Sequence, residues 1–449
     1  MSATATAAAA PRESVLQRIL KKPITATFIA IALGFAVAAL LLTAAGYDAG
    51  ASFSALFEGV LSKPKYISNT IIKAAPIILT GISVAFAFKT GMFNIGAEGQ
   101  YVAGTICAVL VGSTLDLPMV LQIPVVVLAG VLGGAIIGSI TGFLKARFGI
   151  HEVITAIMLN WTMLYLNNFV VNSAMFHRPS STSSIPVNPS SYTMILPEWK
   201  LSDAGLEQLR QTPWLFDFLV KSDVNIAFIV AILVAVAIWF VLYRSKLGFE
   251  LRAVGFNRDA AEFAGMPVER NTVLAMAIAG GISGLAGALM ITGVAPHCIS
   301  TLAGFENYGF NGFSVALIAG SSPIGCIFAG LLFGGLLYGG TSVQMAVGAP
   351  TDIINIMIGT IVFFVALARV VTLLADHLEK RRIEKAGAGC TAAASADADE
   401  AAGGVAPQPD ADAGAVQAAD TQDAAELATE PAASTESAST ATEQEATHA

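Results

Sequence analysis

The stretch GAEGQYVAGTICAVLVG, residues 96–112, aligns without a gap with GFENYGFNGFSVALIAG, residues 304–320. Five positions are identical, and they include the glutamates Glu98 and Glu306. A similar offset relates further pairs in the same order, which are NTII (69–72) with NTVL (271–274), AGVLGG (129–134) with AGLLFG (329–334), and HEVITAIM (151–158) with TDIINIMI (351–358). Collinear matches of this kind indicate one unit used twice. Two such halves in a membrane are the usual architecture of a transport path.

The composition is that of a membrane protein. Hydrophobic residues make up 55% of the 449 positions and charged residues 12%, with a mean hydropathy of +0.69. Soluble domains carry roughly 25% charged residues. The net charge of −8 arises at the end of the chain, because the last 64 residues hold 12 of the 32 acidic residues and none of the 24 basic ones. Having little large apolar surface to offset its chain entropy, this tail is predicted to be disordered.

Hydrophobic segments predict an all-α polytopic membrane protein. A spanning helix needs about 20 mostly apolar residues. We predict ten spans, at residues 24–45, 67–88, 96–111, 118–144, 153–171, 224–243, 271–294, 308–320, 323–340 and 353–374. Basic residues cluster before the first span and after the last, so the positive-inside bias places both ends in the cytoplasm. Each half then has five crossings, which makes the two halves inverted five-helix repeats. A re-entrant hairpin over 308–340 is an alternative that leaves the ends unchanged.

Two long polar loops interrupt the spans. The predicted parts are a cytoplasmic N-terminal segment (1–23), a transmembrane domain (24–376), a basic cytoplasmic flank (377–385) and the acidic tail (386–449). Residues 172–223 are predicted to face outward and residues 244–270, which carry five Arg or Lys residues, to face the cytoplasm. Within the second loop, Asn257 is a candidate cap for a short helix and Gly265 a candidate stop. That short helix is predicted to present one face made of Ala260, Ala261, Phe263 and Ala264.

Three motifs in this order resemble a known family. They are FKTGMFNIGAEGQ (88–100), HEVITAIMLNW (151–161) and GFELRAVGFNRDAAEFAGM (248–266). They look like the permease subunits of bacterial ABC importers for nucleosides and simple sugars, within the branched-chain amino acid and sugar permease superfamily. The likeness runs from about Lys65 to about Leu374, and GMFNIGAEGQ favours the nucleoside branch. It implies a multi-pass protein of the bacterial plasma membrane that moves nucleosides, or related simple sugars, by alternating access.

The resemblance also implies partners. Such a permease pairs with a second, homologous permease, two cytoplasmic ATPase subunits drive the pair, and an extracellular substrate-binding lipoprotein delivers the ligand. A short helix between the sixth and seventh spans sits in a groove of the ATPase and couples its closure to transport. In this sequence that coupling element falls on Arg252, Ala253, Gly255, Asn257, Ala260, Ala261 and Gly265.

The glycine-rich loops are the candidate substrate path. Glycines permit unwound backbone at membrane depth where protein or a water-filled cavity satisfies the freed groups. Polar side chains beside them offer the hydrogen bonds that a sugar hydroxyl or base edge requires, and Phe93 offers a ring for stacking. The candidates are Phe93, Asn94, Glu98 and Gln100 in the first loop and Glu306, Asn307 and Asn311 in the second. The alternative is that these groups cap helices and fix the packing between spans.

No catalytic chemistry is expected of this chain. It has no Gly-Lys dipeptide and therefore no phosphate-binding GxxxxGK[ST] loop, so ATP must be hydrolysed by another subunit. The four cysteines are isolated and are interpreted as small hydrophobic fillers, and we predict no metal, cofactor or nucleic acid. A second hypothesis is an ion- or proton-coupled secondary transporter, for which Glu98 and Glu306 are the candidate relay. A membrane enzyme is disfavoured.

Overall fold

The computed structural model describes residues 23–196, 199–200 and 202–367, with side chains from residue 28 onward. The described elements are α2 (Pro23–Ala44), α3 (Ala49–Leu61), α4 (Pro64–Lys89), α5 (Ala97–Thr114), α6 (Met119–Phe148), α7 (Glu152–Asn172), η1 (Pro189–Ser191), α9 (Asp203–Arg210), α10 (Pro213–Leu219), α11 (Ala227–Arg244), α12 (Lys246–Phe256), α13 (Arg258–Phe263), α14 (Val268–Gly293), α15 (Tyr308–Ile318), α16 (Gly325–Val347) and α17 (Thr351–Ala366). Within these residues, β structure is limited to three isolated bridges.

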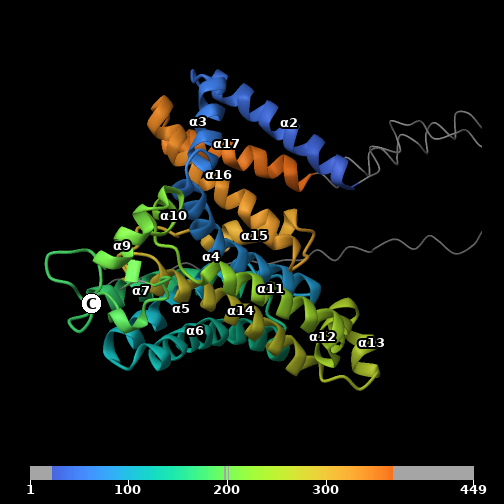
Figure 1. Ribbon diagram of the computed structural model, residues 1–449. Helices are drawn as coiled ribbons and strands as arrows, with labels where there is room; N and C mark the ends of the chain where they lie inside the picture. Colours follow the sequence, from blue (N-terminus) through green and yellow to red (C-terminus); the bar gives the residue numbers. More distant parts are fainter. Residues whose placement is uncertain (1–22, 197–198, 201, 368–449) are drawn as a thin grey trace, which may run out of the picture. The chain divides into compact units, whose positions relative to one another are not determined.

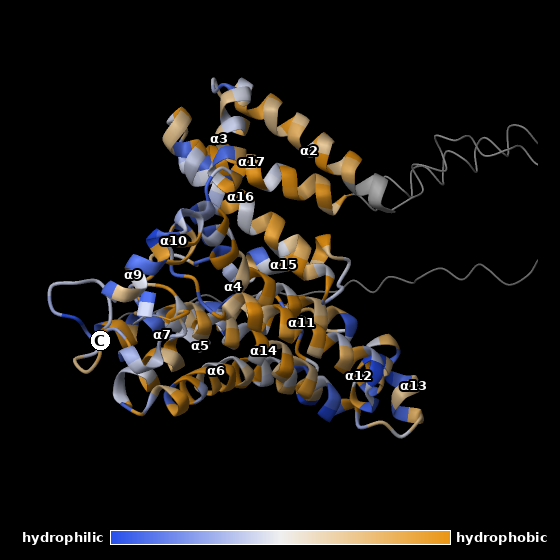
Figure 2. Ribbon diagram, viewed as in Figure 1, coloured by the Kyte–Doolittle hydropathy of each residue, from blue (hydrophilic) through white to orange (hydrophobic). Residues whose placement is uncertain are grey.

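Six of the described helices are long and apolar enough to cross a membrane, namely α4, α6, α7, α11, α14 and α16. Figure 2 shows the apolar residues running along these helices and along the shorter helices α2, α15 and α17. Outward-facing apolar side chains on α6 and α11 are exposed, as Leu128 and Leu233 illustrate. Apolar exposure over whole helix faces fits a lipid surround, because lipid and not water then covers these side chains.

Helices α4 and α14 form the buried centre. Every residue from 74 to 87 of α4 is buried, and α14 is buried along most of its length. A helix that is apolar on all sides belongs in the interior of a protein. Around this centre, α5 and α6 pack against α14, whereas α15 and α16 pack against α4. Each short helix that follows a glycine-rich loop therefore lies against one central helix.

Two matched glycines allow this close packing. A Cβ atom on Gly104 of α5 would lie 2.2 Å from the carbonyl oxygen of Gly284 in α14. A Cβ atom on Gly312 of α15 would lie 2.3 Å from the hydroxyl oxygen of Thr80 in α4. Neither contact tolerates a larger residue without a shift of the neighbouring atoms, and small residues are the usual means of close helix approach in membranes. The two glycines occupy equivalent positions in the aligned stretches of the two halves.

The structure differs from the sequence prediction in the loops. Helix α3 is absent from the prediction, because its 13 residues are too few to span a bilayer. Asp48 starts it by accepting hydrogen bonds from the amides of Gly50 and Ala51, and the helix packs against α16. Residues 172–223, expected as a loop, contain η1, α9 and α10. The predicted N-terminal segment up to residue 22, the end of the last span, the basic flank and the acidic tail lie outside the described residues.

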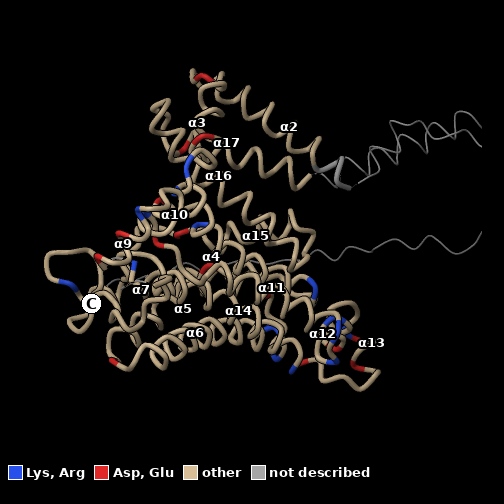
Figure 3. Tube along the Cα trace, viewed as in Figure 1, with Lys and Arg blue, Asp and Glu red and all other residues tan. Residues whose placement is uncertain are grey.

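Residues 244–270 form two helices, not one short helix in a loop. Asn257 separates α12 from α13 and caps α13, its side-chain oxygen lying 3.0 Å from the Ala260 amide nitrogen. Gly265, at a φ of +78°, follows as predicted. The predicted common face is wrong, because Ala261 is buried while Phe263 is 98% exposed. Figure 3 shows that Lys, Arg, Asp and Glu residues gather on these two helices.

Candidate functional site

The first glycine-rich loop, residues 90–100, has its polar side chains satisfied within the protein. The amides of Asn94 and Gln100 exchange two hydrogen bonds of 2.9 and 3.0 Å. Asn94 also donates to the Ser83 hydroxyl, at 3.2 Å. All three side chains are fully buried. Because buried polar groups are costly unless they are paired, this mutual pairing stabilises an unwound segment between α4 and α5.

Glu98 connects the first loop to the second. Its carboxylate oxygens accept hydrogen bonds from the backbone amides of Asn307, at 2.8 Å, and Gly309, at 2.6 Å. These amides lie at the start of α15, where helical N–H groups have no partner within the helix and the helix dipole favours a negative charge. Glu98 is fully buried. It therefore fixes the N-terminus of α15 from the opposite half of the chain.

Further contacts hold the first loop from both sides. Asn160 of α7 accepts a hydrogen bond from the Gly99 amide, at 2.8 Å, and donates to the carbonyl of Ile95, at 3.1 Å. On the other side, the ring of Phe93 packs against Phe88 and Phe313, with 5.3 Å between centroids in each pair. These contacts leave the loop little freedom to move independently of α7 and α15.

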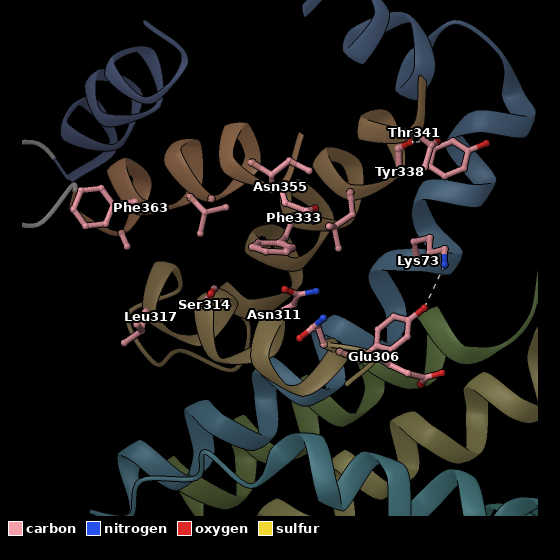
Figure 4. Close-up of a pocket in the computed structure, with 17 residues that line it drawn as sticks. Lys73, Glu306, Asn311, Ser314, Leu317, Phe333, Tyr338, Thr341, Asn355 and Phe363 are labelled. Carbon is pink, nitrogen blue, oxygen red and sulfur yellow. Dashed lines mark hydrogen bonds between the residues drawn. The ribbon is translucent and has the colours of Figure 1, made fainter. Parts of the chain in front are cut away.

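The second glycine-rich loop, residues 304–311, borders a cavity of about 690 Å³, which we call the large cavity. Its walls come from α4, α15, α16 and α17 and combine polar with apolar side chains (Figure 4). Polar groups in the lining include Lys73, Glu306, Asn307, Asn311, Ser314 and Asn355. Lys73 donates a hydrogen bond of 3.3 Å to the Tyr308 hydroxyl. The volume lies in the range of pockets that bind small molecules, about 300–1,000 Å³.

The predicted path residues thus fall into two groups. Glu306, Asn307 and Asn311 line the large cavity. Phe93, Asn94, Glu98 and Gln100 do not appear in its lining, since they are engaged in the contacts described above. Sequence reasoning missed Lys73, Tyr308, Ser314 and Asn355. The signal available for Lys73 is a lysine inside an apolar helix, a pattern that more often reflects a side chain reaching toward the membrane surface.

The residues of the predicted coupling element lie on α12 and α13 and in the turns around α13. Gly255 lies against the first loop, where its Cβ position would be 2.3 Å from the carbonyl carbon of Thr90 and 2.5 Å from the amide nitrogen of Gly91. Ala261 is buried, and Phe256 and Phe263 are 96% and 98% exposed. The guanidinium of Arg252 stacks over the Tyr243 ring at 5.2 Å. Ala253 and Ala260 complete the set on the same two helices.

Fold and site together define a class: a helical membrane protein whose polar cavity is bordered by a glycine-rich loop and the short helix α15, an arrangement that solute transporters use. The sequence comparison gives the family. Residues 66–366 match the family described as the permease component of the branched-chain amino acid transport system. The chain belongs to this permease family. No solved structure matches the chain.

Relatives with named functions cover most of the chain. It is 36% identical over 353 residues to the guanosine ABC transporter permease protein NupP of Bacillus subtilis, covering 79% of this chain and 96% of the relative. It is 34% identical over 367 residues to the nucleoside ABC transporter permease protein NupB of Lactococcus lactis, covering 80% and 97%. Identity to the glucose ABC transporter permease protein TsgB13 of Haloferax volcanii is 29% over 330 residues, covering 73% and 83%.

Proposed function

We propose that this protein is the membrane-spanning permease of an ATP-driven importer that moves nucleosides, or related simple sugars, into a bacterial cell by alternating access. The observation that carries the proposal is the similarity to NupP over nearly the whole of that permease. The large cavity supports it, because hydroxyl-rich ligands require several hydrogen-bonding groups and the lining offers Glu306, Asn307 and Asn311.

The path proposed here runs through the large cavity. The second loop contributes the polar groups that meet the ligand, which are Glu306, Asn307 and Asn311. Phe93, Asn94, Glu98 and Gln100 serve the path indirectly: Glu98 holds the start of α15, Phe93 packs against α15, and the Asn94–Gln100 pair holds the loop that carries Glu98. Because α15 carries Asn311 and Ser314, the first loop positions the lining of the cavity.

Separate subunits hydrolyse ATP in this proposal. Two cytoplasmic ATPase subunits dock on α12 and α13, a second homologous permease completes the pore, and an extracellular substrate-binding lipoprotein delivers the ligand. Support for the docking surface comes from Phe256 and Phe263, whose near-complete exposure on a charged cytoplasmic element leaves apolar area for a partner. Because Gly255 of α12 contacts Thr90 and Gly91, a movement of the docked ATPase is passed through α12 to the first loop.

The proposed membrane arrangement is based on the repeat in the sequence. We propose ten spans in two inverted halves, with both ends in the cytoplasm of the plasma membrane. Reciprocal packing supports this, because α5 and α6 lie on α14 whereas their repeat mates α15 and α16 lie on α4. The same relation holds for Gly104 and Gly312. Opposite halves that exchange contacts in this way are typical of inverted-repeat transporters.

Reconstitution tests the function directly. Proteoliposomes are assembled with this chain, its candidate partner permease, ATPase subunits and lipoprotein, and uptake of a radiolabelled ribonucleoside is measured. We expect uptake that requires both ATP and the ATPase subunits. Uptake by this chain alone, driven by an ion or proton gradient, would instead establish the secondary-transporter hypothesis.

A further inference from the structure

A second, smaller cavity shares Glu306 with the lining of the large one. This small cavity has a volume of about 180 Å³ and lies between α5, α7, the end of α14 and the residues that follow it. Its polar lining includes Tyr101, Thr105, Asn167 and Glu306. Glu306 is the residue that lines both cavities. A volume of this size holds part of a small-molecule ligand and not the whole of one, since complete ligand pockets measure about 300–1,000 Å³.

Tyr101 carries a hydroxyl that makes no hydrogen bond of good geometry with the described residues. The side chain is fully buried, and its hydroxyl has no hydrogen-bond partner among the described residues. An unpaired buried hydroxyl is costly, and each such group in a folded protein calls for an explanation. The neighbouring Thr105 hydroxyl, in contrast, donates to the carbonyl of Val102 at 2.8 Å. The unpaired group is therefore a feature of Tyr101 and not of the cavity wall in general.

Glu306 has the complementary chemistry. Its carboxylate lies close to the Tyr101 hydroxyl, although the two groups do not form a hydrogen bond of good geometry. A carboxylate offers two acceptor oxygens and no donor, and the phenol hydroxyl of tyrosine both donates and accepts. None of the ion pairs among the described residues involves Glu306. In Glu98, the aligned residue of the first loop, both carboxylate oxygens accept hydrogen bonds from backbone amides. Two neighbouring hydroxyls on a ligand, which donate to the two carboxylate oxygens and accept from Tyr101, would match this set.

We propose that Tyr101 and Glu306 form a subsite for the vicinal hydroxyls of the transported ligand, with the remainder of the ligand in the large cavity. This inference rests on the proposed function, because it assumes a ligand with a pentose ring. Apolar side chains of the large cavity, such as Phe333, Leu337 and Phe363, provide a surface for the flat base. Tyr101 packs on the ring of Tyr308 with 5.1 Å between centroids, which fixes its position beside Glu306.

The test measures discrimination between ligands in the complete importer. Uptake of a ribonucleoside and of its 2′-deoxy analogue is compared in proteoliposomes for the wild type, Tyr101→Phe and Glu306→Gln, with the same lipoprotein throughout. We expect each substitution to lower the preference for the ribonucleoside by about tenfold, the effect of one lost hydrogen bond to the ligand. Tyr165→Phe is the matched control, because that ring is 64% exposed on α7, and its preference should equal the wild type.

A stability measurement separates ligand binding from a structural role. Because the Tyr101 hydroxyl makes no hydrogen bond of good geometry with the described residues, Tyr101→Phe should leave the thermal midpoint of the ligand-free complex unchanged or raise it. A lowered midpoint with unchanged preference in both variants would overturn the subsite, since the hydroxyl would then serve the fold through Glu306. Unchanged preference at an unchanged midpoint would overturn it as well. Absence of ATP-dependent uptake in the wild type would instead reject the proposed function on which the subsite rests.

Discussion

The two glycine-rich loops share one sequence pattern and use it in different ways. In the first loop, Asn94, Glu98 and Gln100 are fully buried and hydrogen-bonded. In the second, Glu306 and Asn311 face open cavities. The pattern Gly-x-Glu is the same at both positions. In the first copy, the glutamate joins the two halves of the chain by hydrogen bonds. In the second copy, the glutamate lines two cavities.

This difference gives the two aligned stretches different roles in the structure. Glu98 is committed to the amides of Asn307 and Gly309, so that the second loop is held in place by the first. The first loop also touches α12 through Gly91 and Gly255. In the proposed function, the first loop supports the second and links it to α12, while the second loop lines the path.

The largest effect is expected where the first loop meets α12. Gly255→Val would place its Cβ atom within 2.3 Å of the Thr90 backbone, so that α12 must move away from the loop. We expect uptake to fall at least tenfold with insertion into the membrane preserved, and ATPase subunits to dock poorly. Gly335→Ala is the control, because its nearest neighbours lie 3.7 Å from the added atom. Wild-type uptake and co-purification for Gly255→Val would place the coupling surface elsewhere.

A smaller effect is expected at the link between the loops. Glu98→Gln keeps the size of the side chain but presents an NH₂ group to one of two backbone amides, so one hydrogen bond is lost at a cost of roughly 1–3 kcal/mol. We expect uptake to fall several-fold and the thermal midpoint to drop, as measured on expression-matched complexes. Glu58→Gln, on α3, should change neither. A phenotype that depends on the proton gradient would favour the secondary transporter.

The smallest effect is expected from removal of the C-terminal tail. Truncation after Gly389 should leave uptake, expression and assembly at wild-type levels, because the match to the permease family ends at residue 366. The measurement is uptake at matched membrane levels, together with co-purification of the ATPase subunits. Loss of assembly in the truncated protein would show that the acidic tail has a partner.

The parts of the fold that depend on apolar length and repeated pattern could be predicted from the sequence. Spans such as 67–88 and 271–294 coincide with α4 and α14 to within a few residues at each end. Helix α3 was not predicted, because its 13 residues are too few for a membrane-spanning helix. The packing of Gly104 on Gly284 also lay beyond prediction, because packing partners are not encoded in local periodicity.

The site, like the fold, could be predicted from the sequence only in part. Polar residues beside glycines indicated both loops, but the sequence alone did not tell which polar groups would pair with each other. Asn94 and Gln100 are six positions apart and meet only because the backbone between them is unwound. Lys73 and Asn355 reach the large cavity from α4 and α17, elements far apart in the chain. Residues so far apart in the chain meet only through tertiary packing, which no single sequence motif predicts.

The different roles of the two loops are tested most directly by one matched pair of variants, Asn94→Ala and Asn311→Ala. Both remove the same amide, and for each variant the thermal midpoint of the complex and the KM for ribonucleoside uptake are measured. Asn94→Ala breaks three buried hydrogen bonds and should lower the midpoint by several degrees. Asn311→Ala should keep the midpoint and raise the KM, because its side chain faces the large cavity. The reverse result, a stable Asn94→Ala with a raised KM and a destabilised Asn311→Ala, would contradict the account.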